Sequence, residues 1–264
     1  MFIVDEEINA VFTKIALRNY VKTKVSEYYG NLNNEIRNVE KSDYEQFIHL
    51  TIQKGQQYGL YSERSINCIH TMMYYLGCDF DIDPMFKWAR IPILTNSGNK
   101  IRDEESSYEN LKKVYDNFYT FYTKTVGANN EHIKNSLAKL NEIKFQQFIL
   151  LKSDSIILDF LSDIYPERFA LIANSAWPLV LEKSAFLAME YGLDPLCGKA
   201  LMACLIFAQG IGFNHDPLCR AIRPKILATV IIRLQREENA FYQLKAAAQT
   251  RLELLLKEEK NCEV

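Results

Sequence analysis

Two stretches of this 264-residue chain decide the fold: YGLYSERSINCIHTMMYYLGCDFDIDP at residues 58–84 and YGLDPLCGKALMACLIFAQGIGFNHDP at residues 191–217. The second stretch follows the first at an offset of 133 residues, without a gap. Over the 37 positions from 58 to 94, this offset gives ten identities. In the first copy they are Tyr58, Gly59, Leu60, Gly77, Phe80, Asp83, Pro84, Arg90, Ile93 and Leu94. The pattern predicts a chain built from two related units.

The shared residues have structural roles in a helical unit. Glycine adopts the left-handed backbone that ends a helix without steric cost. Aspartate before proline favours a helix start, because the carboxylate accepts from free amides and proline fits the first turn. Removing the Asp83 carboxylate should then cost about 1 kcal/mol, as for a typical N-terminal cap. The expected caps are Gly59, Gly77, Asp83, Pro84, Gly192, Gly210, Asp216 and Pro217. Between these signals, Phe80 and Phe213 are expected in the core.

Helical periodicity dominates the rest of the chain. A capping box at residues 42–45 (SDYE) is expected to begin the second helix. Glycine and proline together number only 17, too few for an all-β protein with many turns. The expected helices cover residues 5–29, 42–59, 62–76, 84–91, 104–126, 132–163 (one or two helices), 176–191, 195–209 and 224–260. The class is therefore all-α, with two tandem degenerate helical repeats packed as a bundle, at 1–130 and 131–264, or as one continuous domain.

Composition limits the compartment and the partners. Hydrophobic residues make up 48% and charged residues 24%, the balance of a protein with a sizeable core. The net charge is −2, so we expect no nucleic-acid partner. The acidic start at residues 5–7 does not fit a signal peptide, and no apolar run is long enough to cross a membrane. The six cysteines contain no CxxC pair. We expect a cytoplasmic protein with reduced cysteines and no membrane partner.

The alternating acids Asp79, Asp81 and Asp83 invite comparison with a calcium loop. The comparison fails, because the sixth position is Pro84 where glycine is needed and the twelfth is Arg90 where a bidentate glutamate is needed. We interpret the acids as a helix cap and solvated loop carboxylates. The four histidines, 49, 70, 132 and 215, are scattered and match no metal-binding spacing. No metal and no cofactor are expected.

The sequence also lacks the common catalytic motifs. There is no GxSxG elbow, no P-loop and no GxGxxG after a strand. We therefore expect no catalytic residues and no enzymatic activity. A helical enzyme whose site is assembled from scattered polar residues is a further alternative. The many aromatic residues between 108 and 122 favour internal packing, with a protein-contact face as the other interpretation.

Three segments together resemble a known family: YGLYSER at 58–64, GCDFDIDP at 77–84 and the pair Trp88-Ala89. They are similar to small helical proteins encoded beside effectors of bacterial type VI secretion systems. The likeness covers residues 45–95, and the second unit is less similar because it lacks the Trp-Ala pair and most of the acids. The resemblance implies a role near a secreted effector, as immunity protein or adaptor.

On this basis we expect a protein-binding module whose partner is a cognate effector or toxin. An immunity protein that neutralises the toxin in the cytoplasm is favoured over an adaptor or chaperone that loads the effector. Asp79, Asp81 and Trp88 are the expected contact residues, because the second unit does not need them for its fold. Assembly into a homo-oligomer is left open.

Overall fold

The computed structural model describes residues 6–31, 39–91 and 104–222, together with 241–242, 245–246 and 249. Every regular element within these residues is a helix, which confirms the all-α class. The helix expected at 224–260 lies outside the described residues, apart from the helical positions between 241 and 249. None of the helices in the described part of the chain has both the length and the apolar character to cross a bilayer.

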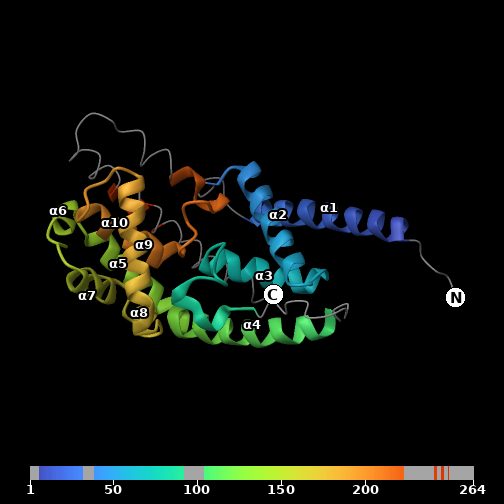
Figure 1. Cartoon of the computed structure of the whole chain (residues 1–264), viewed down its shortest axis with the longest axis horizontal. Helices are drawn as coiled ribbons and strands as arrows, with labels where there is room; N and C mark the ends of the chain where they lie inside the picture. Colours follow the sequence, from blue (N-terminus) through green and yellow to red (C-terminus); the bar gives the residue numbers. More distant parts are fainter. Residues whose placement is uncertain are drawn as a thin grey trace.

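The first five elements follow the expected order (Figure 1). They are α1 (Glu6–Asn31), α2 (Lys41–Gln57), α3 (Glu63–Leu76), the 3-10 helix η2 (Pro84–Ala89) and α4 (Glu104–Val126). Ser62 caps α3, because its side chain accepts a hydrogen bond from the Ser65 N–H at 3.3 Å. The capping box expected at 42–45 is wrong: α2 begins earlier, after Glu40, and no side chain caps it.

The next elements differ from expectation within the segment 132–163 and at the short helix Pro166–Ala170, which was not expected. The segment 132–163, expected as one or two helices with a break near residues 153–155, contains three helices. The break before α7 lies at the expected place, whereas the break between α5 and α6 was not expected. Lys144 N–H donates to Gln147 Oε1 at 2.7 Å where α6 begins, and Ser153 caps α7. The elements that follow α4 are η3 (Ala128–Asn130), α5 (Glu131–Glu142), α6 (Phe145–Phe148), α7 (Asp154–Ile164), α8 (Pro166–Ala170), η4 (Asn174–Ala176), α9 (Trp177–Glu190), α10 (Cys197–Gln209) and η5 (Pro217–Ile222).

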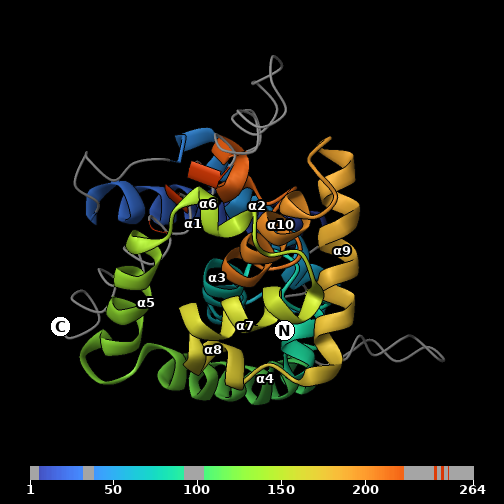
Figure 2. The same ribbon diagram turned by 90° about the vertical axis from the view of Figure 1, so that its left-hand side faces the viewer.

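The long helices pack in two pairs, and the short helix that follows each pair packs on a helix of the other pair. Helix α2 packs against α3, and α9 packs against α10. The short helix η2, which follows α3, packs on α9, whereas η5, which follows α10, packs on α2. Helix α4 runs along the bottom of the molecule in Figures 1 and 2 and contacts α3, η2, α5 and α8. Each of these short helices thus packs on a long helix from the other half of the chain.

Aromatic side chains fill the core between these elements. Phe80 and Phe213, expected in the core, are both buried. On α4, Phe118 and Phe121 are buried, whereas Tyr119 is 61% exposed. This helix therefore directs most of its aromatic surface inward, as expected for internal packing.

A buried cation lies among three of these rings. The guanidinium carbon of Arg168 lies 5.4 Å from the ring centroid of Phe86, 5.7 Å from that of Phe121 and 5.6 Å from that of Phe207. A guanidinium over aromatic faces is stabilised by the ring quadrupoles. Since Phe86 belongs to η2 and Phe207 to α10, Arg168 joins elements from both pairs.

Candidate functional site

The candidate site lies where α3 and α10 end next to each other. Both helices end at a glycine with positive φ, +99° at Gly77 and +88° at Gly210. A Cβ on Gly77 would lie 2.3 Å from the Gln209 carbonyl oxygen, and one on Gly210 would lie 2.2 Å from the Leu76 carbonyl oxygen. The two glycines thus allow a close backbone contact that no larger residue permits.

Two aspartates link the loops that follow these glycines. Asp83 Oδ1 accepts from the Met85 N–H at 2.8 Å, and its Oδ2 accepts from the Ile211 N–H at 2.8 Å. Asp216 has the same pair of roles. Its Oδ1 accepts from the Leu218 N–H at 2.9 Å and its Oδ2 from the Cys78 N–H at 3.2 Å. Each carboxylate therefore caps its own short helix and also holds the opposite loop.

Burial strongly affects the Asp83 carboxyl group. Desolvation raises the pKa of Asp83 to about 6, even though the hydrogen bonds from Met85 and Ile211 and the Arg168 charge act to lower it. The group thus lies in a site from which water is largely excluded. Such a site favours hydrogen bonds within the protein over exchange with solvent.

A second acid of the loop, Asp81, is also bound internally. Its carboxylate forms an ion pair with Lys54 and accepts a hydrogen bond from the Tyr58 hydroxyl, both from the α2 end. The Lys54 and Asp81 side chains are only 11% and 10% exposed. The interpretation of Asp81 as a solvated loop acid is therefore wrong, because this carboxylate neutralises a lysine buried over the Phe80 ring.

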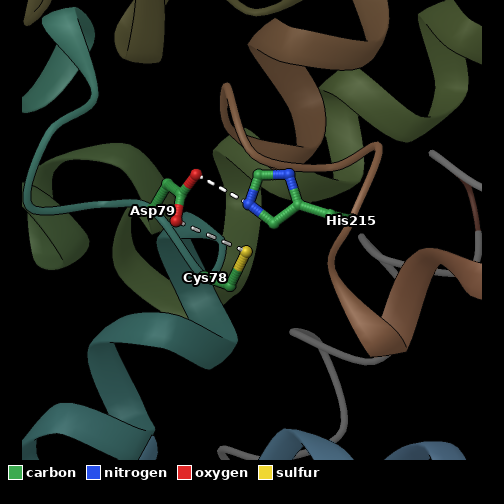
Figure 3. Close-up of side chains that lie close together, drawn as sticks. All are labelled: Cys78, Asp79 and His215. Carbon is green, nitrogen blue, oxygen red and sulfur yellow. Dashed lines mark hydrogen bonds and ion pairs between the residues drawn. The ribbon is translucent and has the colours of Figure 1, made fainter. Parts of the chain in front are cut away.

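The third acid, Asp79, lies in a mixed cluster with Cys78 and His215 (Figure 3). Asp79 Oδ2 lies 2.8 Å from His215 Nε2, and Asp79 Oδ1 lies 3.9 Å from Cys78 Sγ. Cys78 Sγ also lies 3.7 Å from the Gly212 carbonyl oxygen. The three potential ligand atoms all lie within 4.8 Å of one another. Cysteine and aspartate come from the loop after α3, and histidine comes from the loop after α10.

The electrostatics of this cluster disfavour a nucleophilic cysteine. Burial, reinforced by the charges of Asp216 and Asp79, raises the pKa of the Cys78 thiol well above its usual range. Burial acts to raise the pKa of Asp79 as well, but the hydrogen bond and charge of His215 and the charge of Lys54 outweigh it, so the pKa is lowered. His215 Nε2 pairs with the Asp79 carboxylate, which disfavours a role of this nitrogen as the general base for the thiol.

The remaining expected contact residue, Trp88, lies at the end of η2 and is half-buried. Its ring packs against Phe86 at a centroid distance of 6.0 Å and against Phe121 at 5.5 Å. Trp88 therefore packs against rings of η2 and α4 and lies apart from the loop acids, and part of its side chain belongs to the core. The structure brings Asp79 and Asp81 together with Cys78, Lys54 and His215, but not with Trp88.

A separate groove of about 650 Å³ lies between α3 and α4. Its walls include Glu63, Arg64, Cys68 and Lys112. The guanidinium carbon of Arg64 lies 5.0 Å from the Tyr108 ring centroid, so part of this wall is an internal packing contact. The groove is open and its charges are of mixed sign, which does not define a ligand chemistry.

Sequence reasoning missed Lys54, Tyr58 and His215 as members of this site. Lys54 and Tyr58 precede the loop acids by more than twenty residues, and their spacing matches no known motif. His215 could have been found through the 133-residue offset, since that offset aligns position 215 with Ile82 in the acidic loop.

No protein-family model, curated protein or solved structure matches this chain.

Proposed function

We propose that this chain is a non-catalytic protein-binding module whose partner is a cognate effector of a bacterial secretion system. Within that class we favour an immunity protein that blocks a type VI toxin. The resemblance of residues 45–95 supports the choice of partner. The observation that carries the binding role is an exposed apolar face on α9.

This α9 face consists of Leu179, Phe186 and Met189, which are 49%, 51% and 72% exposed. Their spacing of seven and three residues places them along one side of the helix. The opposite side of α9 packs on α10. Clustered large apolar side chains on a surface favour protein contact, and methionine and phenylalanine are enriched in such interfaces. Lys183 Nζ lies 5.2 Å from the Phe186 ring centroid and adds a charge to the same face.

The loop acids differ in how far a partner could reach them. Asp81 and Asp83 bind groups of the chain itself, so the fold alone explains why these two acids occur in the loop. A partner can reach Asp79 more easily, because its side chain is 22% exposed. Asp79, Asp81 and Trp88 stay predicted contact residues, but the α9 face offers a partner more apolar surface.

We also propose that the two halves are degenerate copies of one helical unit. Shifted by 133 residues, η2 (Pro84–Ala89) coincides with η5 (Pro217–Ile222), and α3 overlaps α10 almost completely. The hydrogen bonds of Asp83 and Asp216 also correspond at that offset, to Ile211 and Cys78 respectively. The crosswise packing of η2 on α9 and η5 on α2 follows the same correspondence. Unrelated segments have no reason to share contacts at a constant spacing.

The binding proposal is tested by co-expression with candidate type VI toxins, including any encoded beside the gene. The intact chain should restore growth, and Phe186→Glu should reduce survival at least tenfold because it replaces an apolar contact at the centre of the face with a charged, hydrated side chain. Tyr119→Glu, on α4, is the matched control, since Tyr119 is also exposed and aromatic. Thermal unfolding of each variant shows whether the fold is kept.

Three outcomes separate the alternatives. Loss of protection in Phe186→Glu but not in Tyr119→Glu supports an immunity role through the α9 face. A chain that fails to protect but is needed for export of the effector is an adaptor. If the chain neither protects nor affects export, the proposal is wrong.

A further inference from the structure

We propose that Cys78, Asp79 and His215 form a binding site for a thiophilic divalent cation, Zn²⁺, that ties the loop after α3 to the loop after α10. This inference is independent of the α9 face and of any partner protein. It is built on the three side chains in Figure 3 and on the backbone around them.

The donor set indicates the metal. A thiolate, an imidazole nitrogen and a carboxylate oxygen are the three ligand types that Zn²⁺ uses in proteins. Hard cations such as Ca²⁺ and Mg²⁺ take oxygen ligands and do not favour a thiolate. The cysteine and the histidine therefore favour zinc over calcium.

The three donor atoms are near enough to one another to bind one zinc ion after a small rearrangement. Zinc bonds of roughly 2.0–2.3 Å at tetrahedral angles place ligand atoms about 3.3–3.6 Å apart. Asp79 Oδ2 and His215 Nε2 are 2.8 Å apart, and Asp79 Oδ1 and Cys78 Sγ are 3.9 Å apart. Ligand atoms that all lie within 4.8 Å can reach a shared ion by small side-chain rotations. Binding would release the thiol proton and replace the contact between Asp79 and His215 with two bonds to the metal.

The backbone around the cluster leaves room for this arrangement through Gly212. A Cβ at this position would lie 2.8 Å from the Asp79 carboxyl carbon. The glycine thus lets the Asp79 carboxylate lie directly against the second loop. Gly212 does not have a positive φ, so only this close approach restricts the residue.

The cluster also lies where the two halves differ. At the 133-residue offset, Cys78 corresponds to Ile211, Asp79 to Gly212 and His215 to Ile82. The glycines and aspartates that shape the junction recur in both halves, but the three donor residues occur once each. Because the other half folds without these donor residues at the equivalent positions, the shared fold does not require them. This favours a role in binding a ligand such as the metal ion.

Charge and access suit a cation. Asp79, Asp81, Asp83 and Asp216 lie around the cluster, and Lys54 is paired with one of them. Cys78 is buried, whereas the His215 side chain is 54% exposed, so an ion can enter from the histidine side. The fourth ligand would then be a water molecule on this side, as in sites with three protein ligands.

Titration of the full chain with Zn²⁺, followed by calorimetry, tests the proposal. We expect one equivalent of zinc to bind, and at a free concentration a hundred times the dissociation constant the unfolding equilibrium constant should fall about a hundredfold. Cobalt in place of zinc should give a thiolate-to-metal charge-transfer band. His215→Asn and Cys78→Ser should each weaken binding at least tenfold, because even the indirect partners of metal ligands contribute about 10–100-fold.

Matched controls keep the test decisive. His49→Asn and Cys68→Ser change residues outside the cluster and should leave the affinity and stoichiometry unchanged. His215→Asn serves if Cys78→Ser does not fold, because His215 is the exposed member of the cluster. Gly212→Ala should also weaken binding by displacing Asp79. The proposal is overturned if folded protein binds no stoichiometric zinc, or if His215→Asn binds it with unchanged affinity.

Discussion

Replacing Asp83 with alanine tests whether the junction depends on both oxygens of this carboxylate. The sequence alone assigns Asp83 a helix cap, with a cost of about 1 kcal/mol on removal. The structure adds the bond from the Ile211 N–H at 2.8 Å. A buried donor left without an acceptor costs a further 1–3 kcal/mol, roughly. We therefore expect Asp83→Ala to reduce the free energy of unfolding by about 3 kcal/mol.

Urea unfolding at pH 8 measures this loss, because burial raises the pKa of Asp83 to about 6 and the carboxylate is then ionised. With a denaturant slope of about 3 kcal/mol per molar, the midpoint should fall by about 1 M. Asp159→Ala, at an exposed position on α7, should change the stability by less than about 0.5 kcal/mol.

The double variant with Asp216→Ala completes the cycle. Both carboxylates hold the same pair of loops, so their losses should couple by about 1 kcal/mol. A loss of 1 kcal/mol or less for Asp83→Ala, strictly additive with Asp216→Ala, would refute the reasoning. Asp83 would then be a cap alone.

Three further predictions concern other parts of the same framework. Gly77→Ala should cost at least about 3 kcal/mol in urea unfolding, because φ is +99° and the new Cβ would meet the Gln209 carbonyl; Gly55→Ala, which meets mainly the Ile66 side chain, should cost much less. Lys54→Met should cost about 3–5 kcal/mol by leaving the buried Asp81 carboxylate without its cation, and adding Asp81→Asn should recover part of that loss in thermal unfolding. Burial, with a smaller effect of the Lys24 charge, lowers the pKa of His70 to about 4, so its contribution to stability is full above about pH 6.5 and is lost as the pH falls through 4. Over that window wild type should lose about 3 kcal/mol more than His70→Phe, and an equal loss in both proteins would contradict this assignment.

The helices could be predicted from sequence where their signals are local. Apolar periodicity placed α3 and α4 within a residue or two, and Gly77 follows the last residue of α3 as expected. Local signals failed at α2, where Ser42 and Glu45 fit a capping box but the chain enters the helix earlier, at Lys41. They marked the break before α7, where Ser153 caps the helix, but missed the break between α5 and α6, because the buried Ile143 and Phe145 continue the apolar pattern across it.

The site was less predictable because its contacts join distant parts of the chain. The acidic loop was recognised, but Asp81 binds Lys54 of α2 and Tyr58 just after it, and Asp79 binds His215 in the loop after α10. Side-chain spacing along one segment carries no information about such pairs. The offset of 133 residues does carry some, and it aligns the Asp83 and Asp216 contacts that the structure contains.

The crosswise packing of η2 and η5 has a consequence for dissection of this protein. Since η2 packs on α9 and η5 packs on α2, a cut of the chain between residues 130 and 131 leaves each fragment with a helix that has lost its short partner helix. Each fragment alone should aggregate or stay unfolded, whereas the two expressed together should reassociate into a non-covalent complex. Each half of the chain depends on a short helix of the other half. Shortening or lengthening the connection between the halves should therefore affect the folding rate more than the folded structure.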